Sequence, residues 1–108
     1  MRKVGVYYDN VFAGQLVELN KGNYEFSYTD DFIKDNDMPP VSVNLPKSKK
    51  VYHSNYIFPV FTNMLPEGNN RRYLCRVNKI DEDDFFGMLE MVCGKDTVGK
   101  FALNKILE

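Results

Sequence analysis

Residues 3–28 read KVGVYYDNVFAGQLVELNKGNYEFSY, and they contain three alternating segments separated by two turn signals. Apolar and aromatic side chains recur at every second position in 3–8, 12–19 and 24–28, which is the period of a strand with one buried face. The turn pair Asp9-Asn10 and the glycine-containing segment 20–23 suit short hairpin connections. The stretch therefore predicts an antiparallel meander, with a bulge or twist near residues 15–17, where the apolar parity changes.

The next segment predicts a short helical turn and then a fourth strand. Thr29-Asp30-Asp31 supplies capping side chains for a helical turn that runs through Ile33. A loop closed by Pro39-Pro40 follows. Val41, Val43 and Leu45 then alternate, which predicts a strand that ends at Pro46. The lysine-rich segment 47–50 is expected to be an exposed basic loop.

The second half of the chain changes to the period of a helix. Phe58, Phe61 and Leu65 recur at helical spacing, and residues 72–77 are expected to form a second helix. The side chains expected to point inward from that second helix are Tyr73, Leu74 and Val77.

The acidic run that begins at Asp81 predicts the clearest helix of the chain. Asp81 is expected to cap it, and Gly94 stands where a helix C-terminal glycine belongs. Its expected buried residues are Phe85, Met88, Leu89 and Val92. Residues 97–103 then predict a last strand that returns to the sheet. The expected fold is a single α+β domain over residues 1–108, with a small antiparallel β-sheet or partial barrel of about five strands packed with two to three short helices.

Composition limits the function classes. The chain has 108 residues, of which 44% are hydrophobic and 14% aromatic, which is enough for one domain with one core. Its formal net charge is −1, which gives no electrostatic reason for strong binding to nucleic acid or to a membrane surface. Because the sequence has no apolar run typical of a signal peptide or a membrane span, we expect a cytoplasmic protein. Cys75 and Cys93 are expected to be structural thiols.

No residue pattern predicts an enzyme, a cofactor or a metal. Residues 94–100 match most of a nucleotide-binding P-loop, but Phe101 stands where that motif needs Ser or Thr, and the expected helix precedes the loop where the motif needs a strand. His53 is the single histidine and is expected on the surface or on an edge strand. One histidine and two distant cysteines do not make a metal-ligand set.

A sharp corner at residues 61–72 is the best candidate for a recognition surface. Pro66 cannot continue a helix, and Gly68 permits positive φ. The corner carries the exposed polar types that a partner can contact: the candidate contact residues are Glu67, Gly68, Asn69, Asn70, Arg71 and Arg72.

Several segments together resemble the N-terminal subdomain of HipA-type serine/threonine kinases, the toxin kinases of bacterial toxin–antitoxin systems. The segments that carry the resemblance are Val6-Tyr7-Tyr8, Ala13-Gly14, Val41-Ser42-Val43-Asn44-Leu45-Pro46, residues 58–68 with Arg71-Arg72, Asp84-Phe85-Phe86-Gly87-Met88-Leu89, and the set Gly94, Asp96 and Gly99. The phosphate-binding loop, catalytic Asp and metal-binding Asp of a kinase have no counterpart in these 108 residues.

The resemblance implies a standalone protein similar to HipS, the small antitoxin of HipBST-type systems. Such a protein binds a shortened HipA-like or HipT-like kinase, and a HipB-like helix-turn-helix protein is a candidate third member of the complex. The corner residues 67–72 would then contact the kinase. Relatives often carry a bulky residue after Glu-Gly, whereas this chain has Asn69-Asn70, so Arg71 and Arg72 would carry more of the contact.

Three other interpretations stay open at this point. The chain could be the N-terminal regulatory fragment of a longer HipA-type kinase. It could be a small-barrel nucleic-acid-binding module that stacks bases on Tyr24, Phe26 and Tyr28, although alternation on one face favours core packing for these rings. It could also hold a small active site around His53.

Overall fold

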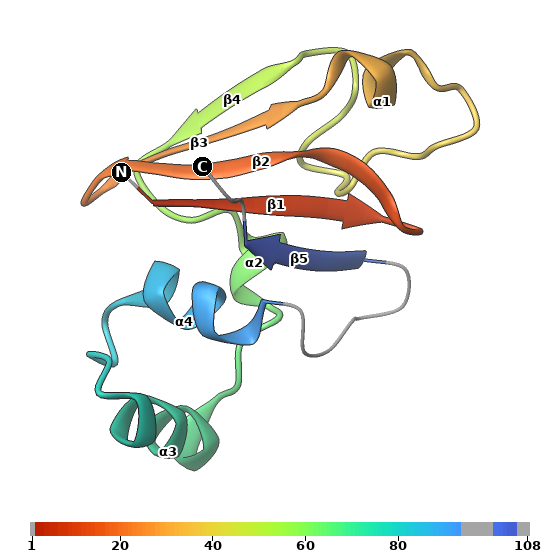
Figure 1. Ribbon diagram of the computed structural model, residues 1–108. Coiled ribbons are helices and arrows are strands. Elements are labelled where there is room, and N and C mark those ends of the chain that lie inside the picture. The colour runs from red at the N-terminus through yellow and green to blue at the C-terminus, as the bar shows by residue number, and fades with distance from the viewer. Residues whose placement is uncertain (1, 94–100, 106–108) are drawn as a thin grey trace.

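The computed structural model describes residues 2–93 and 101–105 of the chain. Within this part, five antiparallel strands form one open sheet in the order β4-β3-β2-β1-β5 (Figure 1). The strands are β1 (Arg2–Tyr8), β2 (Val11–Asn20), β3 (Asn23–Tyr28), β4 (Val51–Ser54) and β5 (Phe101–Lys105). The predicted α+β fold and the three-stranded meander are confirmed, and the sheet is open where a partial barrel was the alternative.

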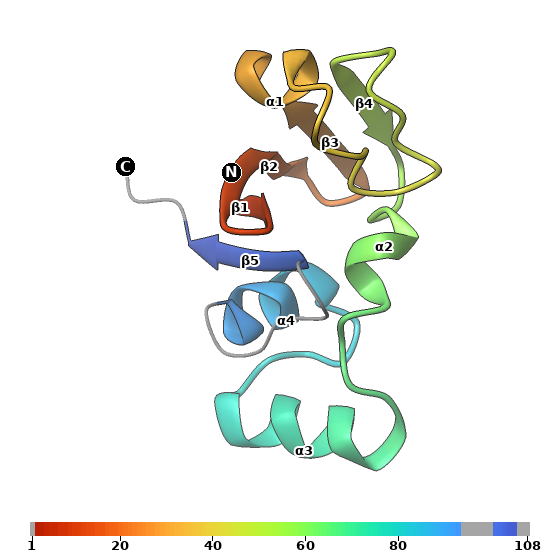
Figure 2. The ribbon, with the colours of Figure 1, turned by 90° about the vertical axis from the view of Figure 1, so that its right-hand side faces the viewer.

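Four helices are present in the described residues, one more than the upper expectation. They are α1 (Asp30–Lys34), α2 (Pro59–Thr62), α3 (Gly68–Asn78) and α4 (Phe85–Val92). Figure 2 shows α4 beside β5 and α3 beyond α4, farthest from the sheet. The molecule is accordingly elongated, with extents of 42 × 28 × 27 Å.

The first hairpin turn has the geometry that its residues suggest, because Asp9 and Asn10 adopt φ values of 50° and 66°. The pairing register of β2 shifts near both of its ends. One shift, in the pairing with β1, lies opposite the step from Val6 to Tyr7, and the other, in the pairing with β3, lies between Glu18 and Asn20. The bulge expected near residues 15–17 is therefore misplaced. Leu16 and Val17 are both buried although they point to opposite faces. The apolar residues change parity here because this part of the strand is covered on both faces.

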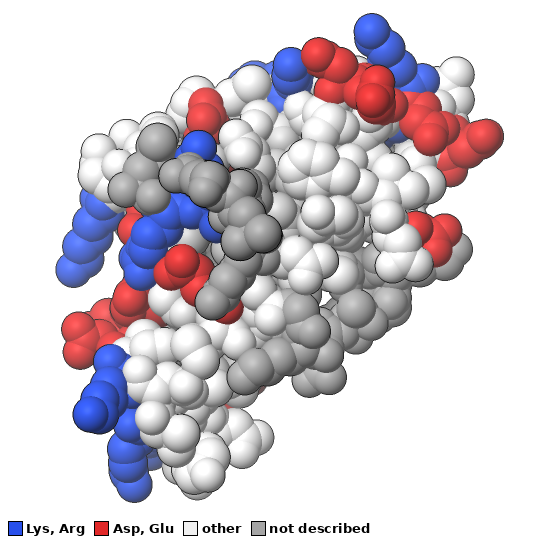
Figure 3. Space-filling model, in the orientation of Figure 1, with Lys and Arg blue, Asp and Glu red and all other residues white. Residues whose placement is uncertain are grey.

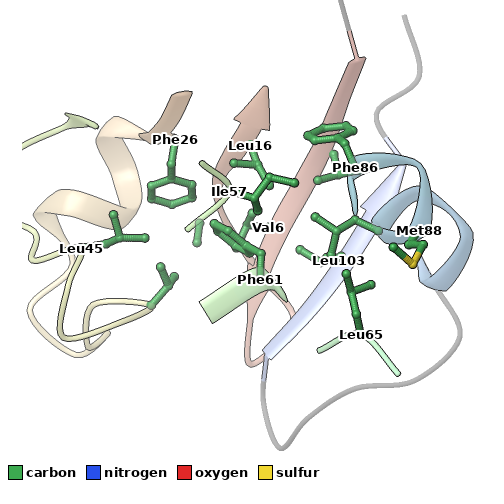
Figure 4. Close-up of a cluster of buried hydrophobic side chains, with 14 of the residues drawn as sticks. Val6, Leu16, Phe26, Leu45, Ile57, Phe61, Leu65, Phe86, Met88 and Leu103 are labelled. Atoms are coloured by element: carbon green, nitrogen blue, oxygen red, sulfur yellow. The ribbon is translucent and has the colours of Figure 1, made fainter. Parts of the chain in front are cut away.

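One core joins the sheet to α2 and α4 (Figure 4). Its members from these elements and their loops include Val6, Leu16, Phe26, Ile57, Phe61, Leu65, Phe86, Met88 and Leu103. The ring of Phe26 contacts Tyr28 edge-on at 4.8 Å between centroids and lies 5.8 Å from Phe61. Phe26 and Tyr28 are buried, and Tyr24 stacks on Phe86 at 6.5 Å. Phe26 and Tyr28 therefore belong to the core and offer no open face to nucleic-acid bases, whereas Tyr24 is partly buried against it.

The strand expected at Val41–Leu45 is wrong, because these residues form a turn. Leu45 N donates to Ser42 O at 3.0 Å, and Asn44 N donates to Ser42 Oγ at 3.2 Å. Val41 and Leu45 are buried while Val43 is 91% exposed, so their side chains do not share one strand face. The buried Tyr28 hydroxyl fixes the turn: it donates to Leu45 O and accepts from Val41 N.

The fourth strand is β4, which pairs with β3 in the register Phe26↔Tyr52. In the basic loop before it, Lys47 is not free, because its Nζ donates to Asp35 O and Met38 O. His53 lies exposed on β4, as expected for an edge strand, and its Nε2 is 3.0 Å from Glu25 Oε1.

Thr29 caps α1 as predicted, with its side chain accepting from Phe32 N. The cap predicted for α4 is shifted by three residues, because the carboxylate of Asp84, and not that of Asp81, accepts from Gly87 N at 3.0 Å. Because the helix begins later than expected, the ring that α4 buries is that of Phe86 and not that of Phe85. Met88 and Leu89 are buried as expected, and Val92 is partly buried.

An arginine at the start of β1 holds α4 to the sheet. Arg2 pairs with Glu18 at 2.6 Å, Asp84 at 2.9 Å and Glu90 at 3.6 Å, and its guanidinium lies over the Phe86 ring. The hydrogen bonds from Arg2, joined by that from Gly87 N, hold the pKa of Asp84 below its ordinary value in spite of partial burial. The hydrogen bonds to Asp84 and Glu18 raise the pKa of Arg2.

The predicted last strand is confirmed as β5, antiparallel to β1 with Val6 opposite Leu103. The helix-ending glycine, the P-loop-like segment 94–100 and the expected start of this strand at 97–100 lie outside the described residues. Neither Cys75 nor Cys93 forms a disulfide, and burial raises the pKa of Cys75.

Candidate protein-binding site

The corner between α2 and α3 is built as its sequence predicts. Met64 N and Leu65 N donate back to Phe61 O and Thr62 O, both at 3.1 Å, which tightens the chain after α2. The buried side chain of Leu65 anchors this turn. Glu67 is then extended, and Gly68 takes a φ of 58° at the start of α3. A left-handed residue here is strained for any side chain but costs little for glycine.

Arg71 fastens the corner to the start of α4. Its Nε donates to Pro66 O at 3.0 Å, and its Cζ lies 5.3 Å from the centre of the Phe85 ring. A guanidinium over an aromatic face is attracted by the ring's negative face. Arg71 is therefore half-buried and positions the corner, while part of it still faces the hollow described next.

A hollow of about 400 Å³ opens beside the corner. Of the predicted contact residues, Glu67 and Arg71 line it. Its other lining residues are Tyr24, Asn55, Tyr56, Ile57, Thr62, Asn63 and Phe85. We call these nine residues the corner groove. Aromatic rings with a few polar groups are the usual lining of a recognition site, and Tyr56 is 80% exposed at its rim.

Sequence reasoning identified only two residues of the corner groove. Two further groove residues carry a sequence signal. Tyr56 is an aromatic residue just after the end of a short strand. Phe85 and Phe86 are neighbours on a helix, so their rings cannot both face the core. Tyr24 and Asn55 carry no such signal, since only the pairing of β3 with β4 brings them to this place.

The remaining predicted contact residues do not line the groove. Asn69, Asn70 and Arg72 are exposed on α3, and Gly68 is exposed with nothing near the position of a Cβ. Arg72 donates to Asn69 Oδ1 at 3.3 Å and lies 3.8 Å from Glu82 Oε1. The six residues thus divide between the groove and the outward side of the helix.

The charges around the corner are separated. Figure 3 shows basic side chains over α3 at the lower left and acidic side chains of the loop before α4 directly above them. The exposed acids of that loop are Asp81, Glu82 and Asp83. A second hollow, of about 220 Å³, has Asp81, Asp83 and the Arg2–Asp84 pair in its lining. A partner that covers this end of the molecule meets both signs of charge.

Metal-ligand clusters and membrane-spanning helices are both absent from the described residues. In residues 2–93 and 101–105, no three His, Cys, Asp or Glu side chains are grouped so that they could hold a metal ion. The same residues contain no helix that is long and apolar enough to cross a membrane. The corner is a hollow with aromatic and polar lining, whose position Arg71 fixes through Pro66 and Phe85.

Comparison with known proteins places the chain in a family. Residues 4–104 match the sequence model of the HipA N-terminal domain. The chain is 25% identical, over 95% of its own length and 24% of the other, to "Putative kinase Y4mE" of Sinorhizobium fredii, so it spans about a quarter of that relative. It is 32% identical to an uncharacterized Haemophilus influenzae protein, over 82% of this chain and 79% of the other.

A solved structure has the same fold. The N-terminal domain of HipA toxin superposes with a TM-score of 0.70 at 21% identity, covering 100% of this chain and 95% of that domain. The overall fold described above is therefore that of a known domain. This protein belongs to the HipA N-terminal domain family.

Proposed function

We propose that this protein is the non-catalytic, kinase-binding subunit of a bacterial toxin–antitoxin system, a HipS-like antitoxin that docks on a HipA-like serine/threonine kinase and restrains it. One observation carries the proposal: the chain aligns over 95% of its length with only 24% of a relative named as a kinase. A domain that is one part of a larger kinase in that relative has a natural docking face for the kinase body.

The corner supports a role in binding. Its groove combines exposed aromatic rings with the carboxylate of Glu67, which makes no side-chain capping bond to α3. Aromatic residues and arginines dominate the binding energy of protein interfaces. Docking at the corner would restrain the kinase either by occluding its substrate or by favouring its inactive conformation.

The proposal includes the other members of such systems. A HipB-like helix-turn-helix protein would be the third member of the complex and would supply the DNA contact, which fits the near-neutral charge of this chain. The complex would work in the cytoplasm, where its kinase meets its substrates.

The test is a purified HipA-like kinase from the same operon that lacks its own N-terminal domain. This protein should co-purify with the kinase, and autophosphorylation should fall as the two reach equal concentration. Glu67→Lys should weaken binding about tenfold, whereas Asp37→Lys, the same charge change in the exposed loop before β4, should not. If the unmodified protein neither binds the kinase nor slows it, the proposal is wrong.

The partial alignment also favours a second candidate. The chain would then be the N-terminal regulatory part of a longer HipA-type kinase, and the same corner would contact the kinase body within one polypeptide. An antibody against the domain separates the two in cells of the source organism: a band near 12.6 kDa supports the separate subunit, and a band several times larger supports the longer kinase.

A further inference from the structure

We propose a second docking surface on the outward side of α3, whose occupant is an acidic amphipathic helix of the partner kinase. This inference rests on the proposed function and extends it beyond the corner groove. The surface, which we call the outer face of α3, consists of Asn69, Asn70, Arg72, Tyr73, Arg76 and Val77.

The geometry of the helix places these side chains together. Residues three and four apart lie on one side of a helix. Tyr73 and Val77 therefore form one row on the side opposite the buried Cys75. Arg72 and Arg76 form the neighbouring row, which borders a hollow that is also lined by Cys75, Asp81 and Glu82. Tyr73 is 69% exposed and Val77 is 58% exposed. The result is an apolar strip with a guanidinium border that no described residue of this chain covers.

The burial of α3 is low for a helix of its length. Of its 11 residues, all in the described part of the chain, only Cys75 is buried. Helices shorter than about 12 residues are marginal alone and depend on packing of an apolar face. Figure 2 shows α3 at the far end of the molecule from the sheet, beyond α4. A partner on its open side would supply the packing that the rest of this chain does not.

The positive charges on α3 favour an acidic occupant. Residues 68–79 contain Arg71, Arg72, Arg76 and Lys79 and no Asp or Glu. Among the residues that the structure describes, Arg76 and Lys79 have no ion pair, and the Arg72–Glu82 pair is 3.8 Å long with both side chains more than half exposed. Such a pair contributes little. Carboxylates on a partner helix would meet the guanidinium groups in the geometry that arginine favours.

Nucleic acid is the less suitable occupant of this basic helix. The middle of the outer face is apolar, and the exposed acids Asp81, Glu82 and Asp83 lie directly after the helix. A nucleic acid carries a phosphate at every nucleotide and would bring some of them against these carboxylates, whereas a helix can carry its acidic residues only beside the arginines. An amphipathic helix, laid against an apolar strip with charges along its border, matches both features.

The experiment measures the affinity of the kinase for four variants by isothermal titration. Arg76→Glu should weaken binding about tenfold, and the paired change Tyr73→Ser with Val77→Ser should do the same. The matched controls are Lys34→Glu on α1, which makes the same charge change at the other end of the molecule, and Val43→Ser, which changes a valine that is even more exposed than Val77. Both controls should bind within twofold of the unmodified protein.

The alternative outcomes are distinct. If Arg76→Glu and the paired change both bind like the unmodified protein, the outer face of α3 is not a docking surface, while the proposed function stands. If the unmodified protein does not bind the kinase at all, the proposed function and this inference both fall. If duplex DNA binds the protein and Arg76→Glu abolishes that binding, the occupant is nucleic acid and the inference is wrong.

Discussion

The sheet and α3 differ in how much of their apolar surface they bury. On β3, Phe26 is fully buried and contacts two other core aromatics. On α3, Tyr73 is comparable in size and points into solvent, and Val77 on the next turn does the same. Burial of apolar area is the main favourable contribution to folding. The sheet therefore holds the fold together, whereas α3 leaves apolar side chains exposed.

The largest effect is expected in the core of the sheet. Phe26→Ala removes a fully buried ring that contacts Tyr28 of the same strand and Phe61 of α2, and it should lower the free energy of unfolding by about 3–5 kcal/mol. Urea denaturation followed by far-UV circular dichroism measures this. Tyr73→Ala on α3 is the matched aromatic control and should cost less than about 0.5 kcal/mol. Equal losses for the two variants would remove the contrast between the sheet and α3.

A second expected effect concerns the close approach of β2 and β3. A Cβ at Gly14 would stand 2.1 Å from the carbonyl oxygen of Ser27, which is backbone and cannot move aside. Gly14→Ala should therefore destabilise the protein by roughly 1–3 kcal/mol or more. Gly5→Ala on β1 is the control, because there the nearest atom, at 3.2 Å, belongs to the side chain of Tyr7. Gly14→Ala should have the lower thermal midpoint of the two variants, and the opposite order would contradict this explanation.

The ion pair between Arg2 and Asp84 should make stability depend on pH. Because the folded-state pKa of Asp84 is lowered, its contribution is complete above the unfolded-state pKa of about 4 and is lost as the pH falls through the folded-state value. Asp84→Asn keeps a capping side chain, so the variant isolates the charge.

At pH 7 the Asp84→Asn variant should be less stable by about 0.5–1 kcal/mol, a value discounted because both side chains are about a third exposed. The difference between the variant and the unmodified protein should shrink as the pH is lowered below about 4. Urea titrations at several pH values measure it. A difference that stays constant down to pH 2 would show that the charge of Asp84 does not stabilise the fold.

The smallest effect is expected on the outer face of α3. Val77→Ser should change the free energy of unfolding by less than about 0.5 kcal/mol, because the side chain is 58% exposed in the free protein. A chemical denaturation curve measures this directly. A loss above 1 kcal/mol would mean that Val77 packs within this chain and is not available to a partner.

The sequence predicted those parts of the fold that depend on local pattern. The alternation in residues 3–28 and the turn pair Asp9-Asn10 were sufficient for three strands, because register follows from which face is buried. Val41, Val43 and Leu45 alternate in the same way, but the Tyr28 hydroxyl, 13 residues from Val41 along the chain, stabilises a turn in their place. That contact is tertiary and has no local signal.

The site was predicted in part for the same reason. Pro66 and Gly68 mark the corner through their backbone chemistry, so its position could be inferred. The orientation of α3 could not, because Tyr73 and Val77 have the spacing of core residues, yet they lie exposed on a helix that is placed beyond α4, away from the sheet (Figure 2). The inward residues expected for α3 were wrong for Tyr73 and Val77, and Leu74 lies partly buried.

Amide hydrogen exchange of the domain alone and in complex with the HipA-like kinase tests the central claim most directly. We expect the amides of α3 and of the corner before it to exchange quickly in the free protein and to become strongly protected in the complex, while those of β1–β3 are protected in both. Protection that appears only on the sheet, or an unchanged α3 in a complex that has formed, would contradict the account.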